Sequence, residues 1–210
     1  MSKSNEYGYI PESPTQASGS NTGIFEVNDV LDLIISEQWA VQDNLQLIET
    51  QSFSGVVNVD FTSIKETEYD THFYVVNNVV MTTSTESVGL RFSESGVLET
   101  ASVYEVAYQN RATDSTYSET KFTATTRIFA TTAVGTGSAD VIGGYGYIYN
   151  AGNSSKYTSV NIASTGIDSI LECRYGGGGL PQASVVDIFR FFNNAGNNMS
   201  GKISLYGVLN

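Results

Sequence analysis

The sequence predicts an all-β protein, a jelly-roll-like antiparallel β-sandwich with an N-terminal extended arm and one short helix. Three observations favour this fold class. Segments rich in Thr, Ser, Val and Tyr alternate between apolar and polar residues after residue 50, Gly- and Asn-rich clusters separate them, and 210 residues are enough to bury one sandwich core. We therefore expect an N-terminal anchoring segment, with the arm and the helix, at residues 1–50 and a β-sandwich domain at residues 51–210.

The first 23 residues are rich in Ser, Asn, Gly, Thr and Pro, which predicts an extended arm and not a packed element. A short helix is expected next, because Asn28 suits an N-cap and Asp29 and Asp32 suit the positive end of a helix dipole. Such a short helix is marginal in water by itself. We expect this region to dock on a neighbouring chain or on the β domain through Tyr9, Ile10, Ile24, Phe25, Leu31, Ile34 and Trp39.

The predicted strands follow the two-residue period of half-buried β-structure. In the first of them, Val57, Val59 and Phe61 share one face. Residues 40–51 are ambiguous, although a strand could begin near Leu45. The predicted strands are 55–61, 69–76, 88–92, 101–108, 121–129, 145–149, 157–162, 169–175, 185–192 and 202–209.

Clusters of Gly and Asn, which tolerate positive φ, predict the turns between these strands. A run of four glycines at residues 176–179 predicts a flexible loop closed by Leu180 and Pro181. A phosphate-binding loop is disfavoured there, because the run lacks a Gly-Lys-Ser/Thr ending and a following helix. The predicted turns lie at 77–78, 93–96, 135–138, 150–153 and 193–197.

The formal charge of −12 is unevenly distributed. Residues 1–50 hold eight acidic residues and one lysine, a net charge of −7. This balance argues against binding to nucleic acid and favours a basic or mixed-charge protein surface as the partner of the N-terminal segment. The chain has neither a long apolar run nor a signal-peptide core, so we expect a protein made in the cytoplasm that does not enter a membrane.

The sequence offers little for catalysis. His72 is the single histidine and lies in a predicted strand, so a structural or surface role is favoured over a catalytic one. Cys173, the single cysteine, is expected to be a small buried residue and has no internal disulfide partner. One histidine and one cysteine do not make a zinc site. We therefore expect no catalytic residues, no metal and no cofactor.

Glu66, Glu68 and Asp70 would project from one face if their segment were extended. A solvated strand edge is the favoured interpretation of this acidic row. The alternatives are a site for a hard cation such as Ca²⁺ or acid/base chemistry of the glycosidase type.

Tyr145, Tyr147 and Tyr149 form a second row on one face. A core or intersheet row is the favoured interpretation. The alternative is an exposed surface that contacts a carbohydrate or another subunit, because tyrosine buries a large area and keeps a polar tip.

Two stretches resemble virion structural proteins of tailed bacteriophages, notably cyanophages and marine phages. They are residues 9–16 with 23–29 and Trp39, and the closing segment Ser-Gly-Lys-Ile-Ser-Leu-Tyr-Gly-Val at 200–208. The resemblance implies a non-enzymatic capsid decoration, head fibre or tail fibre protein that is made in the host cytoplasm, located in the virion and bound to other capsid or tail proteins. The alternatives are a carbohydrate-binding module at a fibre tip, which would bind a host-surface glycan, and a glycan depolymerase with paired carboxylates in a groove.

A homo-oligomer is also expected, because the segments 123–129, 145–149 and 185–192 carry apolar or aromatic residues on both faces. A trimer is favoured by analogy with phage fibres and decoration proteins.

Overall fold

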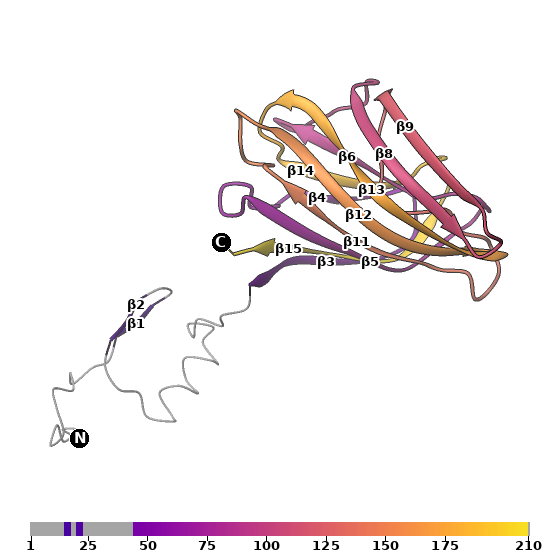
Figure 1. The fold of residues 1–210 in the computed structure, drawn as a ribbon. Helices are drawn as coiled ribbons and strands as arrows, with labels where there is room; N and C mark the ends of the chain where they lie inside the picture. The colour runs from indigo at the N-terminus through magenta and orange to yellow at the C-terminus, as the bar shows by residue number, and fades with distance from the viewer. Residues whose placement is uncertain (1–14, 18–19, 23–43, 210) are drawn as a thin grey trace, which may run out of the picture. The chain divides into compact units, whose positions relative to one another are not determined.

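The computed structural model describes residues 15–17, 20–22 and 44–209 (Figure 1). The chain divides into two compact units, residues 1–43 and 44–210. In the first unit, β1 (Thr15–Ala17) and β2 (Ser20–Thr22) pair antiparallel, so part of the predicted arm has regular structure. The predicted helix after Asn28 lies outside the described residues.

The second unit consists of two antiparallel sheets, which we call the large sheet and the small sheet. The large sheet has eight strands in the order β3 (Leu45–Val56), β15 (Met199–Val208), β5 (Thr71–Met81), β11 (Ile142–Tyr149), β12 (Tyr157–Asp168), β13 (Ile170–Ala183), β8 (Tyr104–Ala112) and β9 (Tyr117–Thr125). The small sheet has five strands, in the order β10 (Ile128–Phe129), β6 (Val88–Glu94), β14 (Ile188–Asn193) and β4 (Asn58–Phe61), with β7 (Val97–Leu98) paired to β6.

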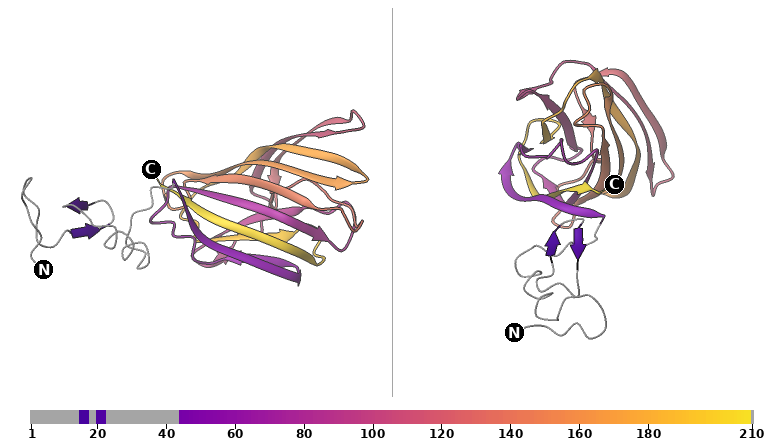
Figure 2. Two further views of the ribbon diagram at one scale, coloured as in Figure 1. Left: turned by 90° about the horizontal axis from the view of Figure 1, so that it is seen from below. Right: turned by 90° about the vertical axis from the view of Figure 1, so that its left-hand side faces the viewer.

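The strand order is that of a jelly roll. Four antiparallel pairs are nested along the chain, namely β3 with β15, β4 with β14, β5 with β11 and β6 with β10, and successive pairs alternate between the two sheets. Two hairpins, β8–β9 and β12–β13, extend the large sheet beyond β11. The predicted antiparallel β-sandwich is therefore confirmed, and Figure 2 shows its two layers.

Aromatic and branched side chains fill the space between the sheets. Phe61 and Phe191 of the small sheet meet edge to face at 5.9 Å between ring centroids, and Tyr74 of the large sheet lies 5.0 Å from Phe191. All three are fully buried, and each such burial stabilises the fold by about 1.5–3 kcal/mol. Burial also raises the pKa of the Tyr74 hydroxyl.

Two of the predicted strands are in fact pairs of strands. The segment predicted at 55–61 crosses from β3 to β4 at Val57, and the one predicted at 121–129 crosses from β9 to β10. Within β4 the expected alternation holds, since Val59 and Phe61 are buried and Asn58 is exposed. Alternation reports which side of a strand is buried, but not which sheet the strand joins. Both crossings were therefore missed.

Two predicted boundaries also differ from the structure. The Asn77–Asn78 pair is not a turn but lies within β5, where Asn78 has a φ of 52° and the pairing with β15 and β11 shifts register. This irregularity is a β-bulge, which uses the same tolerance for positive φ as a turn does. At the start of the body, β3 begins at Leu45, so residues 44–50 belong to the β unit and not to the N-terminal segment.

Candidate functional site

The outer face of the large sheet carries a cluster of aromatic rings. Tyr147 of β11 lies opposite Phe73 of β5, which lies opposite Tyr206 of β15. The Phe73 ring centroid is 4.8 Å from that of Tyr147 and 6.0 Å from those of Tyr145 and Tyr206. We call these rings, together with Tyr149, the aromatic face; Tyr147 and Tyr149 stack at 6.3 Å.

The interpretation of the tyrosine row as a core row is wrong. Its neighbours Gly146 and Ile148 are buried and point toward the small sheet, whereas Tyr145 is 49% exposed. The reason is the packing inside the sandwich. A Cβ atom on Gly146 would lie 2.6 Å from the Tyr74 hydroxyl oxygen, so Tyr74 already occupies the inner space and the tyrosines of β11 face outward.

A small hollow interrupts this face between two tyrosines. Tyr145 of β11, Ala163 of β12 and Tyr175 of β13 occupy one row across three strands. The short Ala163 side chain leaves a hollow of about 210 Å³, and both tyrosines are 49% exposed. Two half-exposed rings with a gap between them can hold a flat, partly apolar group.

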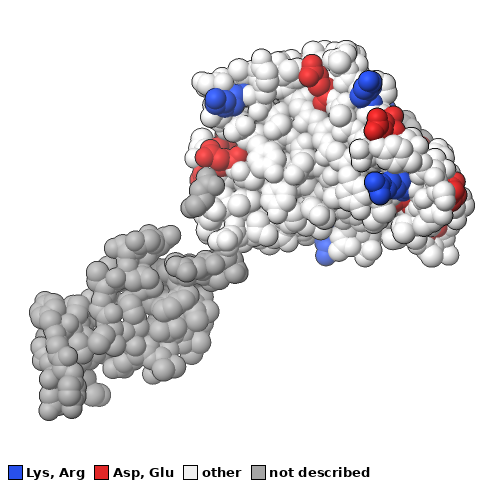
Figure 3. Space-filling model, in the orientation of Figure 1, with Lys and Arg blue, Asp and Glu red and all other residues white. Residues whose placement is uncertain are grey.

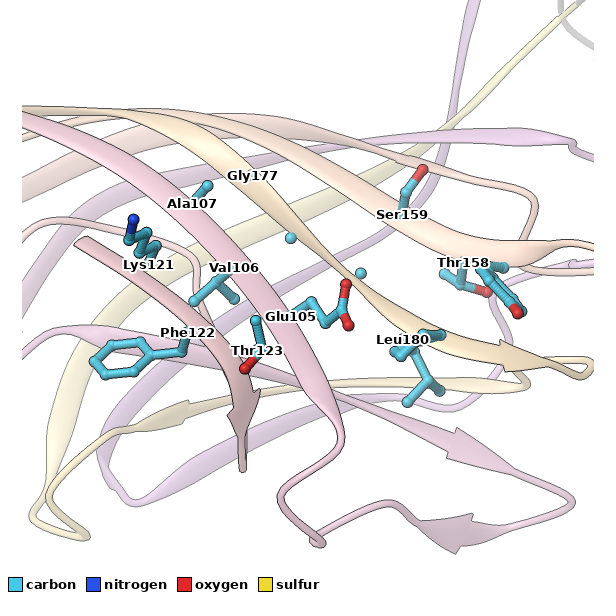
Figure 4. A pocket seen from close by; sticks show the side chains of 14 residues that line it. Glu105, Val106, Ala107, Lys121, Phe122, Thr123, Thr158, Ser159, Gly177 and Leu180 are labelled. Carbon is cyan, nitrogen blue, oxygen red and sulfur yellow. The ribbon is translucent and has the colours of Figure 1, made fainter. Parts of the chain in front are cut away.

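A larger groove of about 650 Å³ lies over the strands that extend the large sheet. The glycine run of β13 forms its floor, and side chains from β8, β9 and β12 form its sides (Figure 4). Glu105 and Lys121 are the charged residues among those that line it, and Phe122 and Tyr157 provide apolar area.

The predicted flexible loop at 176–179 is thus wrong, because the four glycines lie in the middle of β13. The neighbouring strands approach too closely for a side chain. A Cβ atom on Gly177 would lie 2.2 Å from the carbonyl oxygen of Val160, and one on Gly178 would lie 2.6 Å from that of Glu105. Glycine inside a strand is typical of such close backbone approach.

Uncharged side chains cover most of the outer face of the large sheet, and the charged groups lie toward its margins (Figure 3). The residues lining the groove include one carboxylate, Glu105, and those lining the small hollow include none. The depolymerase alternative requires two carboxyl groups across a groove, and neither hollow brings such a pair together.

His72 lies inside the sandwich. It is fully buried, its Nε2 donates to the Ile64 carbonyl oxygen over 2.7 Å, and its ring meets that of Phe189 edge to face at 5.2 Å. Burial lowers the pKa of His72 and favours the neutral ring. The structural role predicted for this residue agrees with its position.

The acidic row has a different geometry from the predicted one. Residues 66–68 form a turn, closed by a hydrogen bond from the Glu68 amide to the Lys65 carbonyl oxygen over 2.9 Å, so Glu66, Glu68 and Asp70 do not share a strand face. Among the described residues, no three His, Cys, Asp or Glu side chains are placed to hold a metal ion. Cys173 is partly exposed in β13, which corrects its prediction as a buried residue.

The remaining predicted contact residues, Tyr9, Ile10, Ile24, Phe25, Leu31, Ile34 and Trp39, lie outside the described residues. The sequence did not indicate Phe73 and Tyr206 as members of the aromatic face, nor Tyr175 as a side of the small hollow. Each lies at an alternating position of a predicted strand, but only the pairing of strands distant in sequence brings them beside the tyrosines of β11.

Within the described part of the chain, no helix is long and apolar enough to cross a membrane. The fold is a jelly-roll β-sandwich with a cluster of aromatic rings on the outer face of its large sheet. Comparisons of the chain with protein-family models, with curated protein sequences and with solved structures give no match.

Proposed function

We propose that this protein is a non-enzymatic structural component of a tailed-phage virion, a capsid decoration, head fibre or tail fibre protein. The observation that supports this proposal is the aromatic, largely uncharged outer face of the large sheet on a stiff jelly-roll body. Exposed aromatic area of this kind is typical of surfaces that contact other proteins. The resemblance to phage virion proteins, carried by residues 9–16, 23–29, Trp39 and 200–208, is the reason to place the protein in a phage particle.

The N-terminal segment is the proposed anchor. Residues 1–43 hold seven acidic residues and one lysine, a net charge of −6, and they carry the apolar residues suited to docking on a neighbouring protein. Many copies on a symmetric particle would make even a weak anchor effective, because the contacts act together.

Deleting residues 1–39 tests the anchor. The truncated protein should fold, since the β unit begins at Asn44, but it should not join the particle. Purified virions would be imaged after labelling the truncated protein and, as the control, the full-length protein with the same tag. Normal incorporation of the truncated protein would contradict the proposed anchor, and the position of the full-length label would distinguish head from tail.

We further propose that the protein is a homo-oligomer, with a trimer favoured by analogy. The exposed Leu47, Phe122, Tyr145 and Tyr175 side chains of the large sheet supply apolar area that self-association would cover. Light scattering on the full-length protein at micromolar concentration measures the mass. A value near the 22.6 kDa of one chain would refute the oligomer, and a dimer would refute only the trimer.

A carbohydrate-binding role at a fibre tip is the second candidate, and the hollow between Tyr145 and Tyr175 favours it. Removing both rings with Y145A/Y175A should abolish binding to bacterial surface glycans on an array while the fold persists. Tyr117→Ala is the matched control, because Tyr117 is 51% exposed on β9 and outside the hollow. If the unaltered protein, Y145A/Y175A and Tyr117→Ala bound the glycans equally, the carbohydrate-binding role would be rejected.

A further inference from the structure

The outer face of the small sheet differs in kind from the aromatic face. Asp60 of β4, Arg190 of β14 and Arg91 of β6 lie opposite one another in one row. Their chain neighbours Phe61, Phe189 and Leu90 are fully buried, so the charged row faces outward. Like charges directly opposite each other weaken a sheet, and this row places two arginines side by side.

Arg127 joins this row from the link between β9 and β10. Its Cδ atom lies 3.2 Å from the position that a Cβ atom would take on Gly89, so its side chain passes over the small sheet. The guanidinium group lies 4.9 Å from the centre of the Phe129 ring. We call Arg91, Arg127 and Arg190 the arginine cluster.

Arg174 lies at the border of this cluster, with its guanidinium 5.6 Å from the centre of the same Phe129 ring. Three of the five arginines of the chain therefore lie together on the small sheet with Arg174 at their border, although the protein has a net charge of −12. Arg111 on β8 is the fifth.

The charge of the cluster is only partly compensated. Asp60 binds Arg190 through two hydrogen bonds, Arg190 Nε to Oδ1 over 2.6 Å and Nη2 to Oδ2 over 2.5 Å. Among residues 44–209 no carboxylate pairs with Arg91 or Arg127. The pKa of Arg91 is lowered, first by burial and then by the neighbouring Arg127 and Arg190.

Hydrogen-bond donors of the cluster are also unused. Arg91 Nε donates to the Thr126 carbonyl oxygen over 2.8 Å, whereas the buried Nε of Arg127 has no partner and its Nη1 reaches Thr126 Oγ1 only at 3.5 Å. A buried donor without a partner costs free energy until an acceptor arrives. An incoming anion would supply that acceptor if the Arg127 side chain turned toward it.

We propose that the arginine cluster is an interface for an acidic segment of a partner protein. Arginine binds carboxylates through a planar fork, and the Asp60–Arg190 pair displays that geometry on the same face. A glycan is disfavoured because guanidinium groups already cover the rings, with Arg91 4.5 Å from the centre of Phe192. Nucleic acid is disfavoured by the net charge of the chain. This interface is independent of the proposed virion function.

The test measures binding of a labelled poly-L-glutamate peptide to the full-length protein by fluorescence anisotropy. Binding should weaken as salt rises, since screening shortens the reach of exposed charges to about 10 Å at 0.1 M. R91Q/R127Q should weaken binding by about tenfold or more, and R91K/R127K should restore part of the loss, because lysine keeps the charge but not the fork.

The matched control is R111Q/K121Q, which removes the same charge from β8 and β9 of the large sheet. It should change the affinity by less than about twofold if the cluster is the site. Circular dichroism checks the fold of each variant. If R91Q/R127Q does not fold, Arg127→Gln alone replaces it in the binding measurement. This single variant should fold, because the side chain of Arg127 makes only one long hydrogen bond.

Three results would overturn the proposal. They are no binding of poly-L-glutamate by the unaltered protein, an equal loss in the cluster and control variants, and binding of the sulfated glycan heparin without binding of poly-L-glutamate. The last result would assign the cluster to an anionic glycan.

Discussion

The outer faces of the two sheets come from one alternating pattern but carry opposite chemistry. On the large sheet, Phe73 and Tyr147 belong to a group of aromatic rings with few charged side chains near them. On the small sheet, Arg91 and Arg190 stand side by side with one carboxylate, Asp60. The net charge of −12 describes neither face. Because the apolar and the basic surfaces are separate, the two proposed interfaces would not compete for the same residues.

The groove on the large sheet depends on the glycines of β13, and Gly177→Ala should have the largest effect. The added Cβ atom would lie 2.2 Å from the Val160 carbonyl oxygen, so the strands must separate at a cost of about 3 kcal/mol. Gly179→Ala is the control, because its Cβ atom has no neighbour closer than 3.1 Å. Urea unfolding measures both, and equal losses would refute the account of close strand approach.

His72 lies between the two faces, and its titration should lower stability at acid pH. Burial lowers the pKa of His72 in the folded protein below the usual 6.5. Below pH 6.5 the His72 side chain of the unfolded chain therefore binds a proton that the folded protein does not bind. The free energy of unfolding should then fall by up to about 1.4 kcal/mol per pH unit, with no contribution from this group above pH 6.5. Urea unfolding between pH 5.5 and 7.5 should show a smaller slope for His72→Gln, and identical slopes would contradict the prediction.

On the small sheet, Asp60→Asn should lower the free energy of unfolding by about 1 kcal/mol, because both partners of the pair are partly exposed. The loss should be larger at low salt, where Arg190 and Arg91 repel each other more strongly. D60N/R91Q should recover part of the stability. Glu68→Gln, which removes the exposed ion pair with Lys65, is the control. If it lowered the free energy of unfolding as much as Asp60→Asn, the Asp60–Arg190 pair would be no more stabilising than an exposed pair.

The smallest effect is expected on the aromatic face. Tyr145→Ser should change the free energy of unfolding by less than about 0.5 kcal/mol, because the ring is half exposed and contributes little to the core. Thermal unfolding measures the change. A loss comparable to that of Tyr74→Ala, which removes a fully buried ring, would show that the aromatic face is part of the core packing.

Local patterns were enough to predict the class of fold. Alternation found β6, β11 and β12, and the glycine and asparagine clusters marked the turns at 93–96 and 193–197. Crossings between sheets were beyond these patterns, because Val57 continues the alternation of Val59 and Phe61 in the sequence but lies between β3 and β4 in the structure, where it is 40% exposed.

The sites were harder to predict than the strands. The tyrosine row was recognised, but its outward direction depends on Tyr74, which fills the inner space over Gly146 from another strand. The glycine run was assigned to a loop because nothing local reveals how close β8 and β12 lie. The arginine cluster brings together residues 91, 127 and 190, and strand pairing alone makes them neighbours.

The nested pairing of the jelly roll has a mechanical consequence. Leu45 at the start of β3 lies opposite Val208 at the end of β15, and the Leu209 amide donates to the Asn44 carbonyl oxygen over 3.0 Å. A pulling force applied between these two ends would act perpendicular to β3 and β15 and break the hydrogen bonds between them one after another. A force applied between Leu45 and Met199 would instead run along the strands and load many backbone hydrogen bonds together. The body should therefore resist stretching strongly in one direction and weakly in the other.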